Sequence, residues 1–255
     1  MNLFSSSPFS FLSPSRSERK VERVRYELKM REVSVARKTP VGESLLAITF
    51  TGEALADFES RGFDDHCKFM FTTPAGEAVR RDYTPRHFDR EKRELTLEFA
   101  LHEHGHATDW ASAAKVGDKA VIGGPRGSMI VPTDLAWYWL IGDASAFPAI
   151  RRRLEELPAG AHVEVVVLCA QAEDRSLFAV AAPERLHCVS SVAELHAKVR
   201  ELALPQGEGY AWCAGESAAA IGVREILRQK GLPKEVMRVA AYWKEGAADF
   251  HEKMD

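Results

Sequence analysis

The stretch Arg81-Asp82-Tyr83-Thr84-Pro85-Arg86 places two guanidinium groups, a phenol and a hydroxyl directly ahead of a strand-like segment at residues 94–101. An extended backbone sends alternate side chains to opposite faces, so Arg81 and Tyr83 are expected to share one face. Arginine offers a rigid fork of donors that suits a diphosphate, and tyrosine offers a flat ring for stacking. A flavin dinucleotide needs both. By themselves, however, the six residues are more typical of an exposed, salt-bridged strand edge.

Short alternating segments surround this stretch and predict the fold. From Tyr26 to about Pro132 they are punctuated by Gly and Pro, which favours a small antiparallel β-barrel. After Asp134, strands and helices alternate, and the β-branched run at 163–169 is typical of a strand buried on both faces. We therefore predict a two-domain α/β protein. It has a lead-in at 1–22, an FAD-binding antiparallel β-barrel domain at 23–133 and an NAD(P)H-binding α/β parallel-sheet domain at 134–255.

Composition limits the classes of protein that fit. The chain has 255 residues and a net charge of −3, with no long block of one sign, which disfavours nucleic acid as a partner. Its four cysteines form no CxxC pair, which argues against a zinc ribbon, an iron–sulfur cluster or a disulfide scaffold. No segment approaches a membrane span, and the first residues run in the opposite order to a secretory signal. We expect a cytoplasmic monomer without a membrane partner.

Four further motifs carry candidate binding groups. Residues 102–110 place Gly105 and Ala107 before a helix expected to start near Thr108, where free N–H groups suit a phosphate. The glycine loop at 123–128 includes Arg126 and is a weak signal alone. Residues 141–149 and 213–216 each lie where a strand is expected to pass into a helix, the place where parallel sheets bind nucleotides. Neither is a GxGxxG fingerprint.

In their order, these motifs resemble the siderophore-interacting, FAD-binding ferric-siderophore reductases, a branch of the ferredoxin-reductase-like flavoproteins. The matching runs lie at 81–86, 102 with 105–110, 124–128, 142–149, 214–216 and 242–246, and they cover nearly everything after residue 25. Three positions depart from the family's usual residues, at Pro85, His106 and Ala241. None of them removes a group that flavin binding requires.

The resemblance implies a role for each matched residue. Tyr83 would pack along the isoalloxazine and Thr84 would hydrogen-bond near flavin N5, which makes these two the candidate catalytic residues. Lys244 and Trp243 would face the substrate, and ordinary solvated-surface roles for Lys244 and Arg86 stay open. The cofactor-binding residues would be Arg81, Tyr83, Thr84, Arg86, His102, Gly105, Ala107, Trp110, Arg126, Gly127, Ser128, Gly142, Asp143, Ser145, Ala146, Gly215 and Glu216. No metal ligands are expected.

Several of these residues also have structural interpretations. Arg126 and Ser128 would either touch phosphate or fix their loop. Asp143 suits a helix cap, and Glu216 suits the first turn of a helix. For the nucleotide, Glu173 and Asp174 suit a ribose diol, whereas Arg175 suits the 2′-phosphate of NADPH. The family favours NADPH over NADH, with a ferredoxin as an alternative electron donor.

The expected reaction follows from electron counting. A nicotinamide delivers two electrons as hydride, Fe(III) accepts one at a time, and a flavin can take the pair and release single electrons. Hard oxygen ligands hold Fe(II) less well than Fe(III), so reduction of a ferric siderophore frees the metal. Two alternatives are a flavin reductase that passes electrons to a protein such as a ferredoxin, and a non-catalytic siderophore-binding protein.

Overall fold

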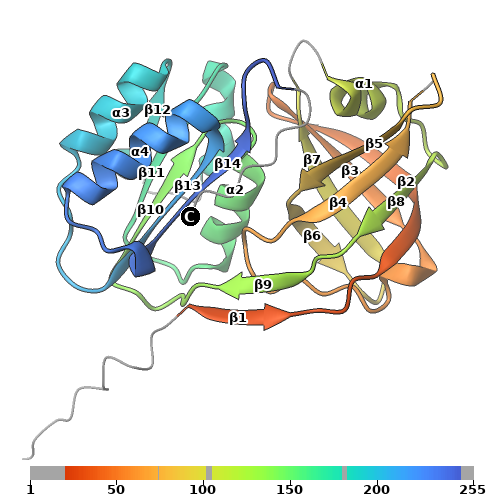
Figure 1. Cartoon of the computed structure of the whole chain (residues 1–255), viewed down its shortest axis with the longest axis horizontal. Coiled ribbons are helices and arrows are strands. Elements are labelled where there is room, and N and C mark those ends of the chain that lie inside the picture. The colour runs from red at the N-terminus through yellow and green to blue at the C-terminus, as the bar shows by residue number, and fades with distance from the viewer. Residues whose placement is uncertain (1–20, 74, 102–104, 180–182, 248–255) are drawn as a thin grey trace, which may run out of the picture.

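The computed structural model describes residues 21–73, 75–101, 105–179 and 183–247. Figure 1 shows two lobes side by side, a barrel made of strands and a sheet flanked by helices. We call them the barrel lobe, formed by β2–β8 with α1, and the sheet lobe, formed by β10–β14 with α2–α4. The predicted lead-in lies outside the described residues as far as Lys20, and Glu22 already belongs to a strand.

The barrel lobe is a seven-stranded antiparallel sheet in the order β5-β4-β8-β2-β3-β7-β6. Its alternating segments bury one face, and Phe50, Phe69 and Phe99 meet inside it with no exposed surface. The lobe also contains a short 3₁₀ helix, η1 (Glu53–Leu55). The elements are β2 (Met30–Val41), β3 (Leu45–Thr51), β4 (Cys67–Thr72), β5 (Ala78–Tyr83), β6 (Pro85–Asp89), β7 (Glu94–Ala100), α1 (His106–Ala113) and β8 (Lys119–Gly123).

The sheet lobe has five parallel strands in the order β12-β11-β10-β13-β14. Helix α2 packs on one face and helices α3 and α4 pack on the other, so the central strands are buried on both sides. Three 3₁₀ turns complete the lobe: η2 (Ala172–Phe178), η3 (Pro183–Arg185) and η4 (Lys234–Val236). The other elements are β10 (Trp137–Gly142), α2 (Phe147–Glu156), β11 (Val163–Leu168), β12 (Leu186–Val189), α3 (Val192–Glu201), β13 (Gly209–Glu216), α4 (Ser217–Gln229) and β14 (Met237–Trp243).

A two-stranded ribbon runs beneath both lobes (Figure 1). It pairs β1 (Glu22–Arg25) with β9 (Gly127–Ile130) in antiparallel register. The sequence did not predict β1, β9 or β12, each of which has four residues. The predicted fold class, an antiparallel barrel followed by a parallel α/β sheet, is confirmed.

Helix α2 fastens the sheet lobe to the barrel lobe through consecutive arginines. Arg152 donates to the backbone oxygens of Ser60 (2.8 Å) and Pro85 (2.9 Å), both on the barrel side. Arg153 donates to the Val131 oxygen at 3.1 Å, in the segment that joins the lobes. Arginine hydrogen bonds to buried carbonyls are costly to break, so these contacts fix the relative position of the lobes.

Candidate functional site

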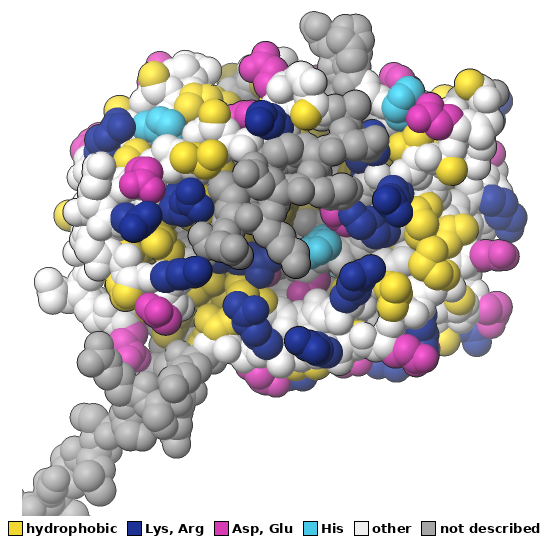
Figure 2. Space-filling model, in the orientation of Figure 1, with side chains coloured by type: hydrophobic (Ala, Val, Ile, Leu, Met, Phe, Trp, Pro, Cys, Tyr) yellow, Lys and Arg dark blue, Asp and Glu magenta, His cyan; other side chains and the backbone are white. Residues whose placement is uncertain are grey.

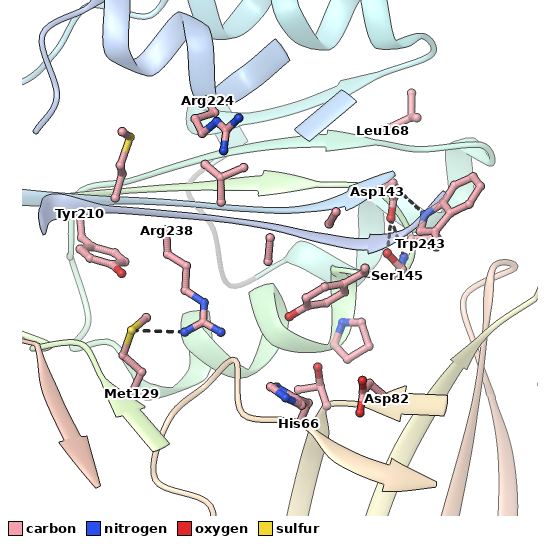
Figure 3. Close-up of a pocket in the computed structure, with 18 of the residues that line it drawn as sticks. His66, Asp82, Met129, Asp143, Ser145, Leu168, Tyr210, Arg224, Arg238 and Trp243 are labelled. Carbon is pink, nitrogen blue, oxygen red and sulfur yellow. Dashed lines mark hydrogen bonds between the residues drawn. The ribbon is translucent and has the colours of Figure 1, made fainter. Parts of the chain in front are cut away.

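A cleft of about 3260 Å³ lies between the lobes and is lined by residues from both. It is several times larger than the roughly 300–1,000 Å³ of a pocket for a drug-sized ligand, so it has room for more than one nucleotide-sized molecule. Figure 2 shows Lys and Arg side chains gathered around the centre of this face of the molecule. Figure 3 shows the side chains that point into the cleft from β14, from the β10–α2 junction and from the barrel.

The end of β5 supplies the barrel wall of the cleft. Arg81, Tyr83 and Thr84 all line it, and Asp82 is held by Lys68 at 2.6 Å. The Tyr83 ring packs against Phe99 with centroids 4.3 Å apart and keeps a partly exposed surface toward the cleft. Burial raises the pKa of the Tyr83 phenol, so this ring stays neutral at physiological pH.

Thr84 links this wall to the opposite lobe. It is only 6% exposed, and its hydroxyl lies near the Tyr242 phenol on β14. Tyr242 also lines the cleft, and burial raises the pKa of its phenol. The two side chains therefore approach each other from the two lobes at the point where the stretch 81–86 passes from β5 into β6.

The start of α1 forms the upper part of the same wall. Gly105, His106 and Ala107 line the cleft, and Gly105 caps the helix without a side-chain hydrogen bond. The first N–H groups of a helix have no intrahelical acceptor, so this end suits an anion. Together with Arg81 and Tyr83, it fits the diphosphate and the ring of a flavin dinucleotide.

Trp110, a predicted residue of the neighbouring motif, stands apart from the cleft lining found among the described residues. Trp110 packs on the barrel's aromatic cluster, 4.8 Å from the Phe69 centroid and 5.6 Å from that of Phe71. His102 lies outside the described residues. Their roles at the flavin stay predictions.

Asp143 organises the sheet-lobe wall. Its Oδ1 accepts from Ser145 N (2.9 Å) and Ser145 Oγ (2.5 Å), and its Oδ2 accepts from Glu216 N (2.8 Å) and Trp243 Nε1 (2.9 Å). One carboxylate thus joins the ends of β10, β13 and β14. Asp143, Ser145 and Trp243 line the cleft where parallel strands end, the usual nucleotide site of such sheets.

The other residues of these two junctions shape the backbone around Asp143. A Cβ on Gly142 would lie 2.5 Å from the Ala214 oxygen, so only glycine fits between β10 and β13. Ala146 is fully buried beneath α2. Glu216 accepts from Ala219 N at 3.0 Å and is the N-cap of α4, one position before the first turn that was considered for it.

Gly215 also meets Asp143. A Cβ there would approach the Asp143 carboxylate to 2.6 Å, and the strand register shifts at Gly215 and Glu216. This glycine therefore lets Asp143 reach β13.

The glycine loop before β9 fixes the ribbon. The Ser128 hydroxyl is hydrogen-bonded to Tyr26 Oη (2.8 Å), Arg61 N (2.9 Å) and the Asp65 carboxylate. It is 5% exposed, so its hydrogen-bonding capacity is used within the protein. Of the two roles considered for Ser128, the contacts favour fixing the loop over touching phosphate.

Gly127 and Arg126 precede Ser128. A Cβ on Gly127 would collide with the Val24 backbone in β1, so glycine allows the ribbon to pair. The Arg126 side chain is exposed, and its backbone oxygen accepts from Tyr26 N at 2.9 Å. Neither residue belongs to the cleft lining found among the described residues.

Arg86 contacts the sheet lobe. Its guanidinium binds both oxygens of Glu155 on α2, at 2.8 and 2.5 Å, and approaches Glu98 at 3.5 Å. Arg151 completes the group with a 2.6 Å bond to Glu98. Arg86 therefore stabilises the interface between the lobes, and its predicted contact with the cofactor stays a prediction.

Asp174 has a different role from the one the sequence suggested. It is fully buried, and its carboxylate accepts from Glu43 N (3.0 Å), Ser44 N (3.2 Å) and Ser44 Oγ in the turn before β3. A carboxylate enclosed by barrel-lobe donors is not available to a ribose diol, so that interpretation of Asp174 is wrong. Glu173 and Arg175 are exposed.

Sequence reasoning missed Arg238, which points from β14 into the cleft (Figure 3). Its Nε lies 2.9 Å from Asp64 Oδ2, and its Nη1 lies 3.3 Å from the Met129 sulfur. Asp64 also accepts from Trp212 Nε1 at 2.9 Å. An alternating strand pattern does not distinguish an arginine of this kind from a solvated one, because its partners lie on distant segments.

A barrel joined to a parallel sheet across such a cleft is the fold of ferredoxin-reductase-like domains. Residues 135–246 match the siderophore-interacting protein model, and residues 34–80 and 73–129 match the siderophore-interacting FAD-binding domain. The chain belongs to the siderophore-interacting protein family.

Named relatives extend over nearly the whole chain. The NADPH-dependent ferric-chelate reductase of Escherichia coli K12 is 32% identical over 244 residues, covering 87% of this chain and 96% of the relative. The ferric vibriobactin reductase of Vibrio cholerae serotype O1 is 29% identical, covering 88% and 93%. The crystal structure of a siderophore utilization protein from T. fusca superposes with a TM-score of 0.79 at 29% identity, covering 90% and 99%.

Proposed function

We propose that this protein is an NADPH-dependent, FAD-carrying reductase that transfers electrons to Fe(III) in a ferric siderophore and releases Fe(II). The main observation behind this proposal is that one cleft is lined on the barrel side by residues suited to bind a flavin and on the sheet side by residues suited to bind a nucleotide. The named relatives, a ferric-chelate reductase and a ferric vibriobactin reductase, support the substrate class.

The barrel wall would hold FAD. Arg81 and the free N–H groups at Gly105–Ala107 would bind its diphosphate, because both are donors in the same wall of the cleft. The neutral Tyr83 phenol would pack against its ring, and Thr84 would orient its reactive edge. When bound, FAD accepts an electron pair from a nicotinamide and gives single electrons to Fe(III).

The sheet wall would orient NADPH. Asp143 fixes Ser145 and Trp243 at the strand ends, so the nucleotide would meet a wall already in place. Arg175, exposed on η2, is the group that suits a 2′-phosphate. The name of the Escherichia coli relative supports NADPH as the donor.

The decisive experiment is spectroscopic. The purified protein should be yellow, and NADPH should bleach the flavin absorbance in the absence of oxygen. Fe(II) released from a panel of ferric siderophores should then be trapped by a ferrous-specific dye, with NADPH, NADH and a reduced ferredoxin compared as donors. A colourless protein that binds chelates without reducing them would instead be a binding protein. Turnover only with a protein partner would favour the ferredoxin-type reductase.

Three further properties belong to the same proposal. We propose a cytoplasmic monomer whose domains divide near residue 133, to be tested by fractionation, light scattering and limited proteolysis. Among the described residues, no helix is both long and apolar enough to cross a membrane.

A further inference from the structure

Arg238 lies at the end of the cleft where no flavin or nicotinamide contact is proposed. Trp243, bound to Asp143, lies five residues further along β14, which is roughly 17 Å at about 3.3 Å per residue. Figure 3 shows Arg238 pointing from β14 toward the barrel side, where His66 lies, with Met129 beside it. This end of the cleft is therefore separate from the nucleotide wall.

The Arg238 guanidinium is held in place from behind. Arg238 Nε lies 2.9 Å from the carboxylate of Asp64, whose side chain is 1% exposed, and Arg238 Nη1 donates to the Met129 sulfur. Arginine has five N–H donors, so these two contacts leave three for a ligand. The side chain keeps 33% exposure toward the cleft.

The anchoring carboxylate is itself fixed. Trp212 Nε1 donates to Asp64 at 2.9 Å from within β13. Although burial favours the neutral guanidine, the Asp64 carboxylate raises the pKa of Arg238, so the guanidinium stays charged. A rigid charged fork loses little conformational freedom when it binds an oxygen-rich anion.

One neighbour of Arg238 in the cleft lining is also cationic. Burial raises the pKa of the Tyr210 phenol, and Arg238 and Arg23 of β1 both act against that rise, so the two guanidinium groups lie near the same ring. Arg224 and Arg228 also line the cleft but come from α4, on the other face of the sheet. Arg238 lies on the same face of β14 as Tyr242, four residues or roughly 13 Å away, and Tyr242 lies near Thr84. A ligand several ångströms across at Arg238 would thus extend toward the wall that is proposed to hold the flavin.

We propose that Arg238 is the substrate-recognition residue, an anchored guanidinium that binds the anionic oxygen face of a ferric chelate and makes the protein prefer anionic over neutral chelates. The inference rests on the proposed function for its substrate class. It assigns recognition to Arg238 in addition to the Lys244 and Trp243 expected from the sequence.

The test compares Arg238→Gln and Arg238→Lys with Arg228→Gln in the full-length, flavin-loaded protein. Arg228 is the matched control, because it lines the same cleft, has a side chain that is 64% exposed and forms a surface ion pair with Glu225 at 3.4 Å. Each variant is assayed with a trianionic ferric tris-catecholate and a neutral ferric tris-hydroxamate, both hexadentate. KM, kcat and the dissociation constant from tryptophan-fluorescence quenching are measured.

Arg238→Gln should raise KM and the dissociation constant for the anionic chelate roughly tenfold, the size expected for one charge-assisted hydrogen bond. The neutral chelate and the KM for NADPH should change less than twofold. Arg238→Lys should recover only part of the loss, because lysine keeps the charge without the fork. Arg228→Gln should have a clearly smaller effect.

Equal losses for both chelates, or equal effects of Arg228→Gln and Arg238→Gln, would overturn the inference. If Arg238→Gln fails to fold because Asp64 is left as a buried charge, Arg238→Lys decides alone, and full affinity for the anionic chelate would then count against a bound fork. The binding arm needs no turnover. A wild-type protein that binds the chelate through Arg238 but reduces none would refute the proposed function and leave this inference standing.

Discussion

Replacing Asp174 with alanine should weaken the contact between the two lobes and lower stability, while nucleotide binding stays unchanged. Asp174 lies in η2 of the sheet lobe, and its carboxylate accepts two backbone N–H groups and one hydroxyl from Glu43 and Ser44 of the barrel lobe. A Cβ on Gly42 would lie 2.5 Å from Asp174 Oδ1, so the turn closes tightly around the carboxylate. Alanine would leave these donors facing a small apolar side chain.

The magnitude follows from the donors left behind. A buried donor without a partner costs about 1–3 kcal/mol, and the Ser44 hydroxyl can rotate to another acceptor more easily than the two N–H groups can. Two orphaned N–H groups give about 3–5 kcal/mol of lost stability after partial relaxation. For a protein of this size, that corresponds to a fall in Tm of about 6–20 °C.

The assay is differential scanning calorimetry of Asp174→Ala beside Glu173→Ala, with the KM for NADPH measured on both. Glu173 is the preceding residue of η2 and is exposed, so its removal should change stability by about 0.5 kcal/mol or less. The Asp174 variant should show the large fall in Tm. Below that Tm, where the protein is folded, its KM for NADPH should be normal.

An unchanged Tm combined with a raised KM for NADPH would refute the reasoning. That result would mean that Asp174 contacts the nucleotide and that its bonds to the barrel lobe contribute little.

Three other variants test the cleft and its surroundings. Arg81→Ala should weaken flavin retention about tenfold or more, measured by the ratio of flavin to protein absorbance. Arg80 is exposed on the other face of β5, so the control variant Arg80→Ala should retain the flavin. Equal flavin loss in both variants would contradict a specific contact between Arg81 and the flavin. Trp243→Phe removes the 2.9 Å bond to Asp143 from a residue 44% exposed, so Tm should change by no more than a few degrees while the KM for NADPH rises several-fold. Burial raises the pKa of Asp65, so the folded protein favours the protonated carboxyl. The stability that this protonated group contributes is full below the unfolded pKa of about 3.9 and is lost as pH rises through the folded pKa. Asp65→Asn should therefore gain Tm relative to wild type from pH 4 to 7, and a constant difference would rule this out.

Local patterns in the sequence were sufficient for the architecture and for one wall of the cleft. Alternation put Arg81 and Tyr83 on one face of an extended run, and both line the cleft. The β-branched segment at 163–169 became β11, buried on both faces. These features depend on residues that are neighbours in the chain, so periodicity reports them directly.

The roles of Arg86, Ser128 and Asp174 depend on partners far away in the chain. Each is a polar residue in a motif or loop where a ligand contact is a reasonable expectation. Each instead meets a group of another segment, Glu155, Asp65 and Ser44 respectively. The same reason explains why β1 and β9 were missed, since four-residue strands become stable only through a partner about a hundred residues away.

The three consecutive arginines of α2 also bear on protein engineering. Arg151 and Arg152 reach the barrel lobe, at Glu98 and Ser60, and Arg153 reaches the segment that joins the lobes. If the sheet lobe of this chain were joined to a barrel without matching acceptors, α2 would present bare guanidinium groups to a foreign surface. Functional chimeras should therefore exchange α2 together with the barrel segments that it contacts. The part of the chain that has to be exchanged as a whole is then larger than either domain.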